Sequence, residues 1–90
     1  MATAIVLLSV EAERTNEIAE ALAAIVGVSE VYSVAGTFDL VAIIRVQDNE
    51  ELAALVTTRI RGVPGIRTSQ TLIAFRAYSR HDLASLFNLD

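Results

Sequence analysis

A seven-residue pattern, Ile-x-Gly-Val-x-x-Val/Ile, occurs twice in the chain, at residues 25–31 and at residues 60–66. In each copy an amphipathic helical pattern precedes the glycine and β-branched residues follow it, and glycine suits the left-handed backbone that ends many helices. The two copies therefore mark equivalent junctions from helix to strand. A chain with two such junctions is restricted to strands and helices that alternate in two similar halves.

The segments around these junctions complete the pattern. Four short runs of branched aliphatic residues predict strands, at residues 4–10, 28–35, 40–46 and 66–78. Apolar residues three and four positions apart predict helices, at residues 15–25, 48–61 and 82–88. The resulting order, β-α-β-β-α-β, predicts an α+β ferredoxin-like sandwich with both helices on one face of a four-stranded antiparallel sheet in the order 4-1-3-2. We expect one domain over residues 1–78 and a helical tail over residues 79–90.

The predicted sheet has too much aliphatic surface for one subunit. Neighbours along a strand point to opposite faces, yet residues 5–8 and residues 40–44 are aliphatic throughout. Two helices cover one face, and the other exposes roughly several hundred Å² of apolar surface. The sheet of a second subunit is one cover, which predicts a dimeric α+β barrel. The alternative is a monomer in which the last helix folds back over this face.

The composition limits the kinds of binding and catalysis that the chain can support. The chain carries seven Arg and no Lys against eleven Asp and Glu, a net charge of −4, and so lacks a basic surface for nucleic-acid phosphates. With no Cys and one His, it offers no thiolate and no cluster of metal ligands. Its apolar runs fall short of the roughly 20 residues of a membrane span, and no signal peptide is recognisable. We expect a cytoplasmic protein without cofactor or metal that binds neither DNA nor membranes by itself.

Few residues look catalytic. His81 and Asp82 could form an active-site pair, but adjacent residues on a helix do not face each other, and Asp82 also suits a helix start. Ser69 and Thr71 stand at strand spacing, so their hydroxyls share one face, without a base that could activate them. Ordinary β-propensity explains them, and so does contact with the polar head group of a ligand.

The most informative segment is Gly36-Thr-Phe-Asp39. It can be a plain hairpin turn, with glycine at a positive φ and aspartate making a local hydrogen bond. It can also be a binding site, because free backbone N–H groups and the Asp39 carboxylate then converge at one end of the sheet. Such a place binds the carboxylate and the ammonium of an amino acid together.

Two stretches resemble a known family: Val31-Tyr-Ser-Val-Ala-Gly-Thr-Phe-Asp-Leu40 and Gly65-Ile-Arg-Thr-Ser-Gln-Thr71. They are similar to the effector-binding domain of the Lrp/AsnC regulators, the regulation of amino acid metabolism (RAM) domain, and the similarity runs from Ala4 to about Ala77. The resemblance implies a non-enzymatic module, a homo-oligomer of dimers closed into a ring, and an amino-acid-like effector bound between subunits. The predicted ligand-binding residues are Ala35, Gly36, Thr37, Phe38, Asp39, Ser69 and Thr71.

The chain departs from the family pattern in three ways. Phe38 stands where the family often has Tyr, and Ser69 stands for the first Thr of its Thr-rich strand. The first strand begins by residue 4, which leaves no room before it for the helix-turn-helix domain of full-length members. The resemblance is therefore to stand-alone RAM proteins, which implies effector sensing or co-assembly with full-length regulators.

Two alternatives share the predicted fold. One is a small dimeric α+β barrel enzyme of the monooxygenase type, and the other is an ACT-type amino-acid-binding domain. The enzyme reading fits less well, because the chain has no Trp and its His81 lies beyond the last strand. The ACT reading fits the Gly36–Asp39 turn less well.

Overall fold

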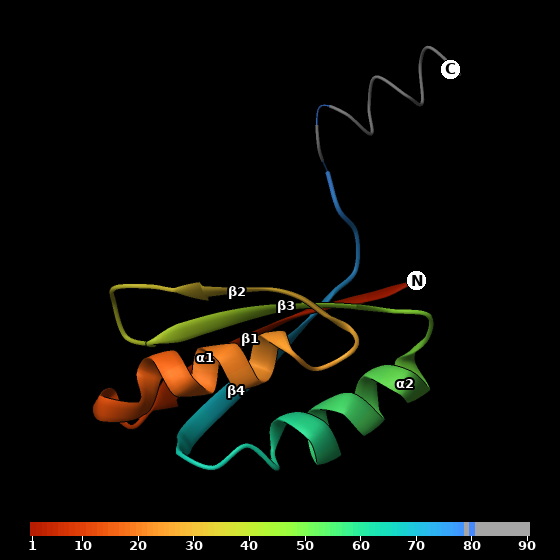
Figure 1. The fold of residues 1–90 in the computed structure, drawn as a ribbon. Coiled ribbons are helices and arrows are strands. Elements are labelled where there is room, and N and C mark those ends of the chain that lie inside the picture. Colours follow the sequence, from red (N-terminus) through yellow and green to blue (C-terminus); the bar gives the residue numbers. More distant parts are fainter. Residues whose placement is uncertain (79, 81–90) are drawn as a thin grey trace.

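A computed structural model of the chain describes residues 1–78 and residue 80. Its strands and helices, in chain order, are β1 (Ala2–Val10), α1 (Thr15–Ala23), β2 (Val28–Ser33), β3 (Leu40–Val46), α2 (Asn49–Ala54) and β4 (Ile66–Ala74). A 3-10 turn, η1 (Ala12–Arg14), leads into α1, and a π-helical segment, η2 (Leu55–Ile60), continues α2. The strands form one antiparallel sheet in the order β2-β3-β1-β4, with both helices on the same side (Figure 1). The predicted ferredoxin-like topology and strand order are confirmed.

Three predicted elements extend beyond the ends that the structure gives them. The helix predicted to reach Ile25 ends at Ala23, because the last turn tightens and the Ile25 N–H donates to Leu22 O. The second strand ends at Ser33, where the hairpin turn begins. The fourth ends at Ala74, because Ala74 pairs with Thr3 close to the start of β1 and little of β1 remains to pair with. The helix predicted over residues 82–88, the tail over residues 79–90 and His81 lie outside the described residues.

The core lies between the sheet and the helices. Every second residue of the two central strands is buried there: Ala4, Val6, Leu8 and Val10 of β1, and Leu40, Ala42, Ile44 and Val46 of β3. The helices bury one stripe each against them: Ile18 and Leu22 from α1, and Leu52, Leu55 and Ile60 from α2 and η2. This alternation places the intervening residues of each strand on the opposite face of the sheet.

No helix in the described part of the chain covers that opposite face, which we call the open face (Figure 1). Its apolar residues are Ile5, Leu7, Val41, Ile43 and Leu72. They lie side by side across three strands, since Ile5 is opposite both Ile43 and Leu72, and Leu7 is opposite Val41. The sequence correctly predicted aliphatic residues on both faces of the sheet. Each central strand has one row under the helices and one row on the open face.

The loop before β2 depends on a glycine. Gly27 has a φ of +104°, and a Cβ there would stand 2.5 Å from Leu55 Cδ1 and 3.0 Å from Val46 Cγ1. Both neighbours are buried, so neither can move aside without disturbing the core. Gly36 also has a positive φ, of +138°, but a Cβ there would meet nothing within 4 Å.

Alanine substitutions of these two glycines distinguish destabilisation by backbone strain from destabilisation by steric overlap. We expect Gly36→Ala to lower the free energy of unfolding by about 1–3 kcal/mol through backbone strain. Gly27→Ala carries the same strain and an overlap with Leu55, so we expect a loss of about 2–5 kcal/mol. Urea unfolding of both variants measures the difference. Equal losses would show that the Leu55 contact adds nothing.

Candidate functional site

The β2–β3 turn exposes a row of backbone donors. Its ends are fixed, because the Val34 N–H donates to Asp39 O at 3.0 Å and the Asp39 N–H donates to Leu8 O at 2.8 Å. Between them, the backbone N–H groups of residues 35–38 have no hydrogen-bond partner among the residues that the structure describes. Ala35, Gly36 and Thr37 are exposed and Phe38 is half-buried. The turn therefore presents unpaired donors at one end of the sheet, as the sequence analysis expected.

Asp39 also holds the fold together. Its Oδ2 accepts a hydrogen bond from the Val10 N–H at 3.0 Å, in a partly buried position. The ladder between β1 and β3 ends at the pair Leu8–Leu40, so the carboxylate continues the connection beyond the last strand pair. This contact supports the turn-closing interpretation of Asp39. It leaves Oδ1 with no hydrogen bond within residues 1–78 and 80, so the interpretation as a ligand contact stays a prediction.

Ser69 and Thr71 lie on the other edge of the sheet. They stand opposite Leu8 and Val6 in the β1–β4 register and so share the helix-covered face. Thr71 lines a hollow of about 250 Å³ between α2 and β4, together with Val56 and Ile73. Ser69 lines an adjoining hollow of about 200 Å³, which Val56 also borders.

The predicted site residues therefore form two groups. Residues 35–39 lie together at the β2–β3 turn, and Ser69 and Thr71 lie together in the groove between β4 and α2. Because β2 and β4 are the two edges of the sheet, one subunit does not bring the groups together. The expectation that two subunits bring these groups into one site stays a prediction.

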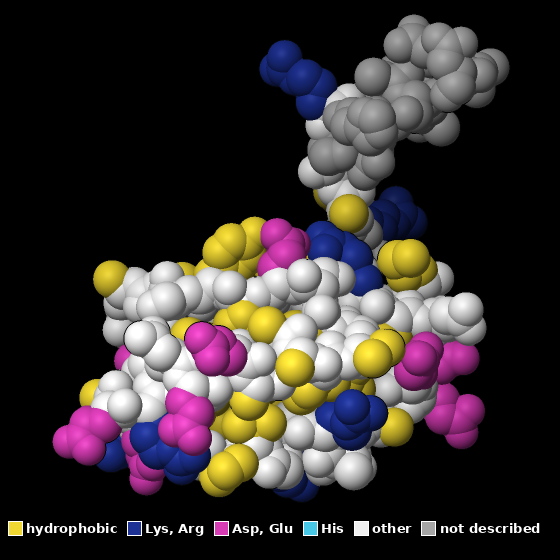
Figure 2. Space-filling model, in the orientation of Figure 1, with side chains coloured by type: hydrophobic (Ala, Val, Ile, Leu, Met, Phe, Trp, Pro, Cys, Tyr) yellow, Lys and Arg dark blue, Asp and Glu magenta, His cyan; other side chains and the backbone are white. Residues whose placement is uncertain are grey.

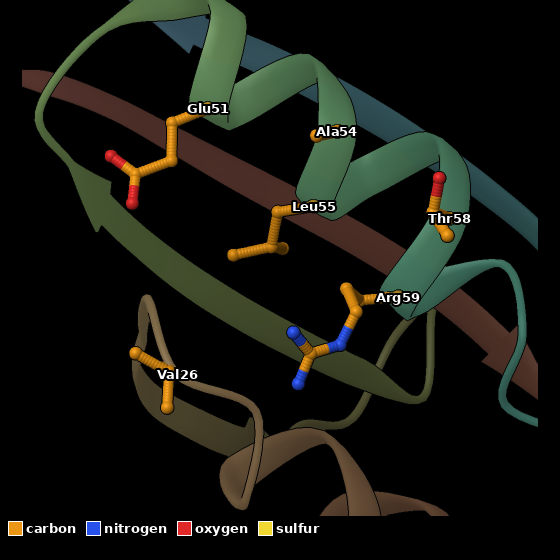
Figure 3. A pocket seen from close by; sticks show the side chains of 6 residues that line it. All are labelled: Val26, Glu51, Ala54, Leu55, Thr58 and Arg59. Carbon is orange, nitrogen blue, oxygen red and sulfur yellow. The ribbon is translucent and has the colours of Figure 1, made fainter.

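A third hollow, of about 300 Å³, lies between the α1–β2 loop and the second helix (Figure 3). Glu51 and Arg59 stand at its two ends, and Leu55 and Ala54 lie between them. Sequence reasoning missed this hollow. Its signal was the spacing of residues 51, 55 and 59, which is one face of a helix, but the opposing Val26 comes from a loop that no periodicity places.

The open face carries a polar cluster at its β2 edge. The Glu30 carboxylate accepts hydrogen bonds from the Tyr32 hydroxyl and from Arg45 Nη1, the latter at 3.4 Å. The hydrogen bond from Tyr32, with help from Arg45, lowers the pKa of Glu30. The same bond to Glu30 raises the pKa of Tyr32. Sequence analysis did not find this cluster, because Arg45 and Glu30 are brought together only by the hairpin register.

Within the described residues, no three His, Cys, Asp or Glu side chains lie close enough to hold a metal ion. In the same part of the chain, every helix is too short or too polar to cross a membrane.

These features place the chain among α+β sandwich domains whose sheet has helices on one face only. The sequence pattern of the Lrp/AsnC ligand binding domain matches residues 3–84. The chain therefore belongs to the Lrp/AsnC ligand-binding domain family, and the family resemblance stated from the sequence is confirmed.

Solved structures show the same fold over most of the chain. The protein TTHA0845 from Thermus thermophilus superposes with a TM-score of 0.83 at 46% identity, over 89% of this chain and 100% of that one. The hypothetical protein PHS023 from Pyrococcus horikoshii gives a TM-score of 0.80 at 32% identity, over 90% of this chain and 98% of that one. Both are thus matched over nearly their whole solved length.

A longer relative is similar as well. The uncharacterized HTH-type transcriptional regulator PH1916 of Pyrococcus horikoshii is 37% identical over 60 residues, which are 67% of this chain and 40% of that protein. The chain thus matches less than half the length of this curated relative.

Substitution of Asp39 separates its structural role from its charge. Asp39→Ala removes the acceptor of the partly buried Val10 N–H, so we expect the free energy of unfolding to fall by about 1–3 kcal/mol. Asp39→Asn keeps an oxygen acceptor and should retain most of the stability. Thermal and urea unfolding of the two variants test this. If Asp39→Ala is as stable as the wild type, the bond to Val10 does not hold the turn.

Proposed function

We propose that this chain is a non-enzymatic effector-binding module that senses an amino acid or a similar zwitterion between subunits. The observation that carries the proposal is the β2–β3 turn, where unpaired N–H groups stand beside the Asp39 carboxylate. Backbone donors bind a carboxylate, and an aspartate binds an ammonium group through a charge-assisted hydrogen bond. The turn thus offers both halves of the recognition that an α-amino acid requires.

The site is completed by another subunit. Residues 35–37 of the turn are exposed, while the groove lined by Ser69 and Thr71 lies at the opposite edge of the sheet. A second copy that sets its β4 edge beside the turn of the first adds two hydroxyls and the apolar side chains of that groove. Selectivity for the effector's side chain then depends on residues of both copies.

The open face is the second interface. Ile5, Leu7, Val41, Ile43 and Leu72 form a continuous apolar surface that no helix in residues 1–78 covers. Burial of such a surface stabilises association by roughly 25 cal/mol per Å². We propose that two copies pack their open faces together as a dimer, and that dimers join through the effector sites into a larger closed assembly.

The regulatory role follows from the family. The relative PH1916 is by its name an HTH-type transcriptional regulator, and this chain matches 40% of it. We propose that the module acts on transcription by co-assembling with regulators that carry a DNA-binding domain. The net charge of −4 supports an indirect role, because the chain offers no excess of basic residues to hold DNA.

The packing between helices and sheet favours binding over catalysis. A monooxygenase-like barrel needs a roomy pocket between these layers, whereas Val6, Leu8, Leu40 and Ile44 at this position are completely buried against the helices. The hollows of the described residues lie at the margins of this packing, one beside the α1–β2 loop and one between α2 and the edge strand β4.

A charge on the open face tests the dimer. We expect Leu7→Asp to convert a dimer into monomers at micromolar concentration, because an unpaired carboxylate cannot be buried between two apolar sheets. Val26→Asp is the matched control, since Val26 is 84% exposed in the α1–β2 loop. Sedimentation velocity measures both variants beside the wild type. A wild type that sediments as a folded monomer would contradict the proposal.

Effector binding is tested by screening and then titration. A thermal-shift screen of the twenty amino acids should identify at least one that raises the melting temperature, because a ligand that binds only the folded state stabilises it. Calorimetric titration of that amino acid should then show affinity about tenfold to a hundredfold weaker in Asp39→Asn, through loss of a charge-assisted hydrogen bond. Unchanged affinity in folded Asp39→Asn would place the site elsewhere.

A further inference from the structure

The segment that follows β4 carries two aromatic side chains with almost no contacts. Residues 75–78 and 80, here called the arm, continue the chain beyond the last paired residue, Ala74. Phe75 is 97% exposed and Tyr78 is 78% exposed. Single exposed apolar residues are common on protein surfaces, but two exposed aromatic residues three positions apart on one segment form a surface suited to a partner.

The arm rises on the side of the sheet that lacks helices. In Figure 1, both helices lie below the sheet and the arm leaves in the opposite direction. At its base, Phe75 and Ala74 line a hollow of about 220 Å³ with Met1 and Thr3. Thr3 lies two residues from Ile5 on the same side of β1. The arm therefore begins at the border of the open face.

The arm carries two arginines beside its two aromatic residues. Arg76 and Arg80 belong to the arm, whereas the two carboxylates of residues 75–90, Asp82 and Asp90, come after it in the sequence. Figure 2 shows carboxylates, in magenta, on the visible face of the body. Arginine and aromatic side chains together are a composition typical of protein–protein interfaces.

We propose that the arm of each copy packs against the open face of a second copy, with the rings of Phe75 and Tyr78 as its anchors. The inference rests on the proposed dimer and assigns to the arm a role in it. A copy placed over the open face lies where the arm of the first copy points. In a two-fold symmetric pair, each arm packs against the other copy, so the rings of both arms are buried in the same association step.

The arm also explains how the border of the open face is closed. The row formed by Ile5, Ile43 and Leu72 reaches β4, and Leu72 is still 41% exposed. Aromatic rings from the facing copy cover the β4 border of the open face, whereas packing of the two sheets alone leaves this border exposed to solvent. Aromatic and arginine side chains are the types that contribute most to such interfaces.

The experiment compares dissociation constants. In the double variant Phe75→Ser, Tyr78→Ser, we expect the dimer dissociation constant to rise at least about a hundredfold, because two anchoring rings are lost from each copy. Val26→Ser is the control, an exposed apolar residue in the α1–β2 loop, and should leave the constant unchanged. Circular dichroism and urea unfolding verify that the double variant keeps the fold.

A second measurement locates the rings directly. In a mixed dimer of isotope-labelled and unlabelled copies, filtered NMR spectra should show contacts from the Phe75 ring of one copy to the methyl groups of Ile5 or Leu72 of the other. Contacts confined to one copy, or a dissociation constant unchanged by the double variant, would overturn the arm proposal. The dimer itself is judged separately by Leu7→Asp. If that variant dissociates and the arm variant does not, only the arm proposal fails.

Discussion

The sheet has two aliphatic faces and only one layer of helices, and the rest of the molecule depends on this imbalance. The helices bury Val6, Leu8, Leu40 and Ile44 completely, which makes a core of adequate depth for a small domain. The open face repeats the same chemistry without a cover in the described part of the chain. A surface of this kind is stable in water when a second copy buries it, which is the association that we propose.

The candidate site sits at the ends of the elements that this packing holds rigid. The N–H groups of residues 35–38, unpaired within the described residues, lie in a turn that Asp39 closes by accepting the Val34 N–H. Asp39 also joins this turn to β1, through Leu8 O and the Val10 N–H. These donors precede the buried central strand β3 directly, so the turn loses little conformational entropy when it binds a ligand. In the proposed site the same aspartate serves both strand pairing and ligand recognition, and a neutral acceptor such as asparagine separates these two roles.

The topology could be predicted from the sequence because its signals are local. Gly27 and Gly62 end helical patterns, β-branched residues follow each, and Asp48 begins the second helix, where its carboxylate accepts the Glu51 N–H at 2.8 Å. Strand lengths were less predictable, since β4 ends where its partner β1 runs out rather than at any residue of its own. The bond from Val10 to Asp39 and the contact of Arg45 with Glu30 could not be predicted, because both depend on strand register.

The central claim is that one effector site is built from two copies, the turn from one and the β4 edge from the other. Subunit complementation tests it most directly. Asp39→Asn damages only the turn, and Ser69→Ala with Thr71→Val damages only the edge, so each variant alone should bind the responding amino acid weakly. When the two are refolded together, the account predicts that calorimetric titration recovers wild-type affinity at a fraction of the sites, where an intact turn meets an intact edge. A mixture that binds no better than either variant alone would contradict a site shared between subunits.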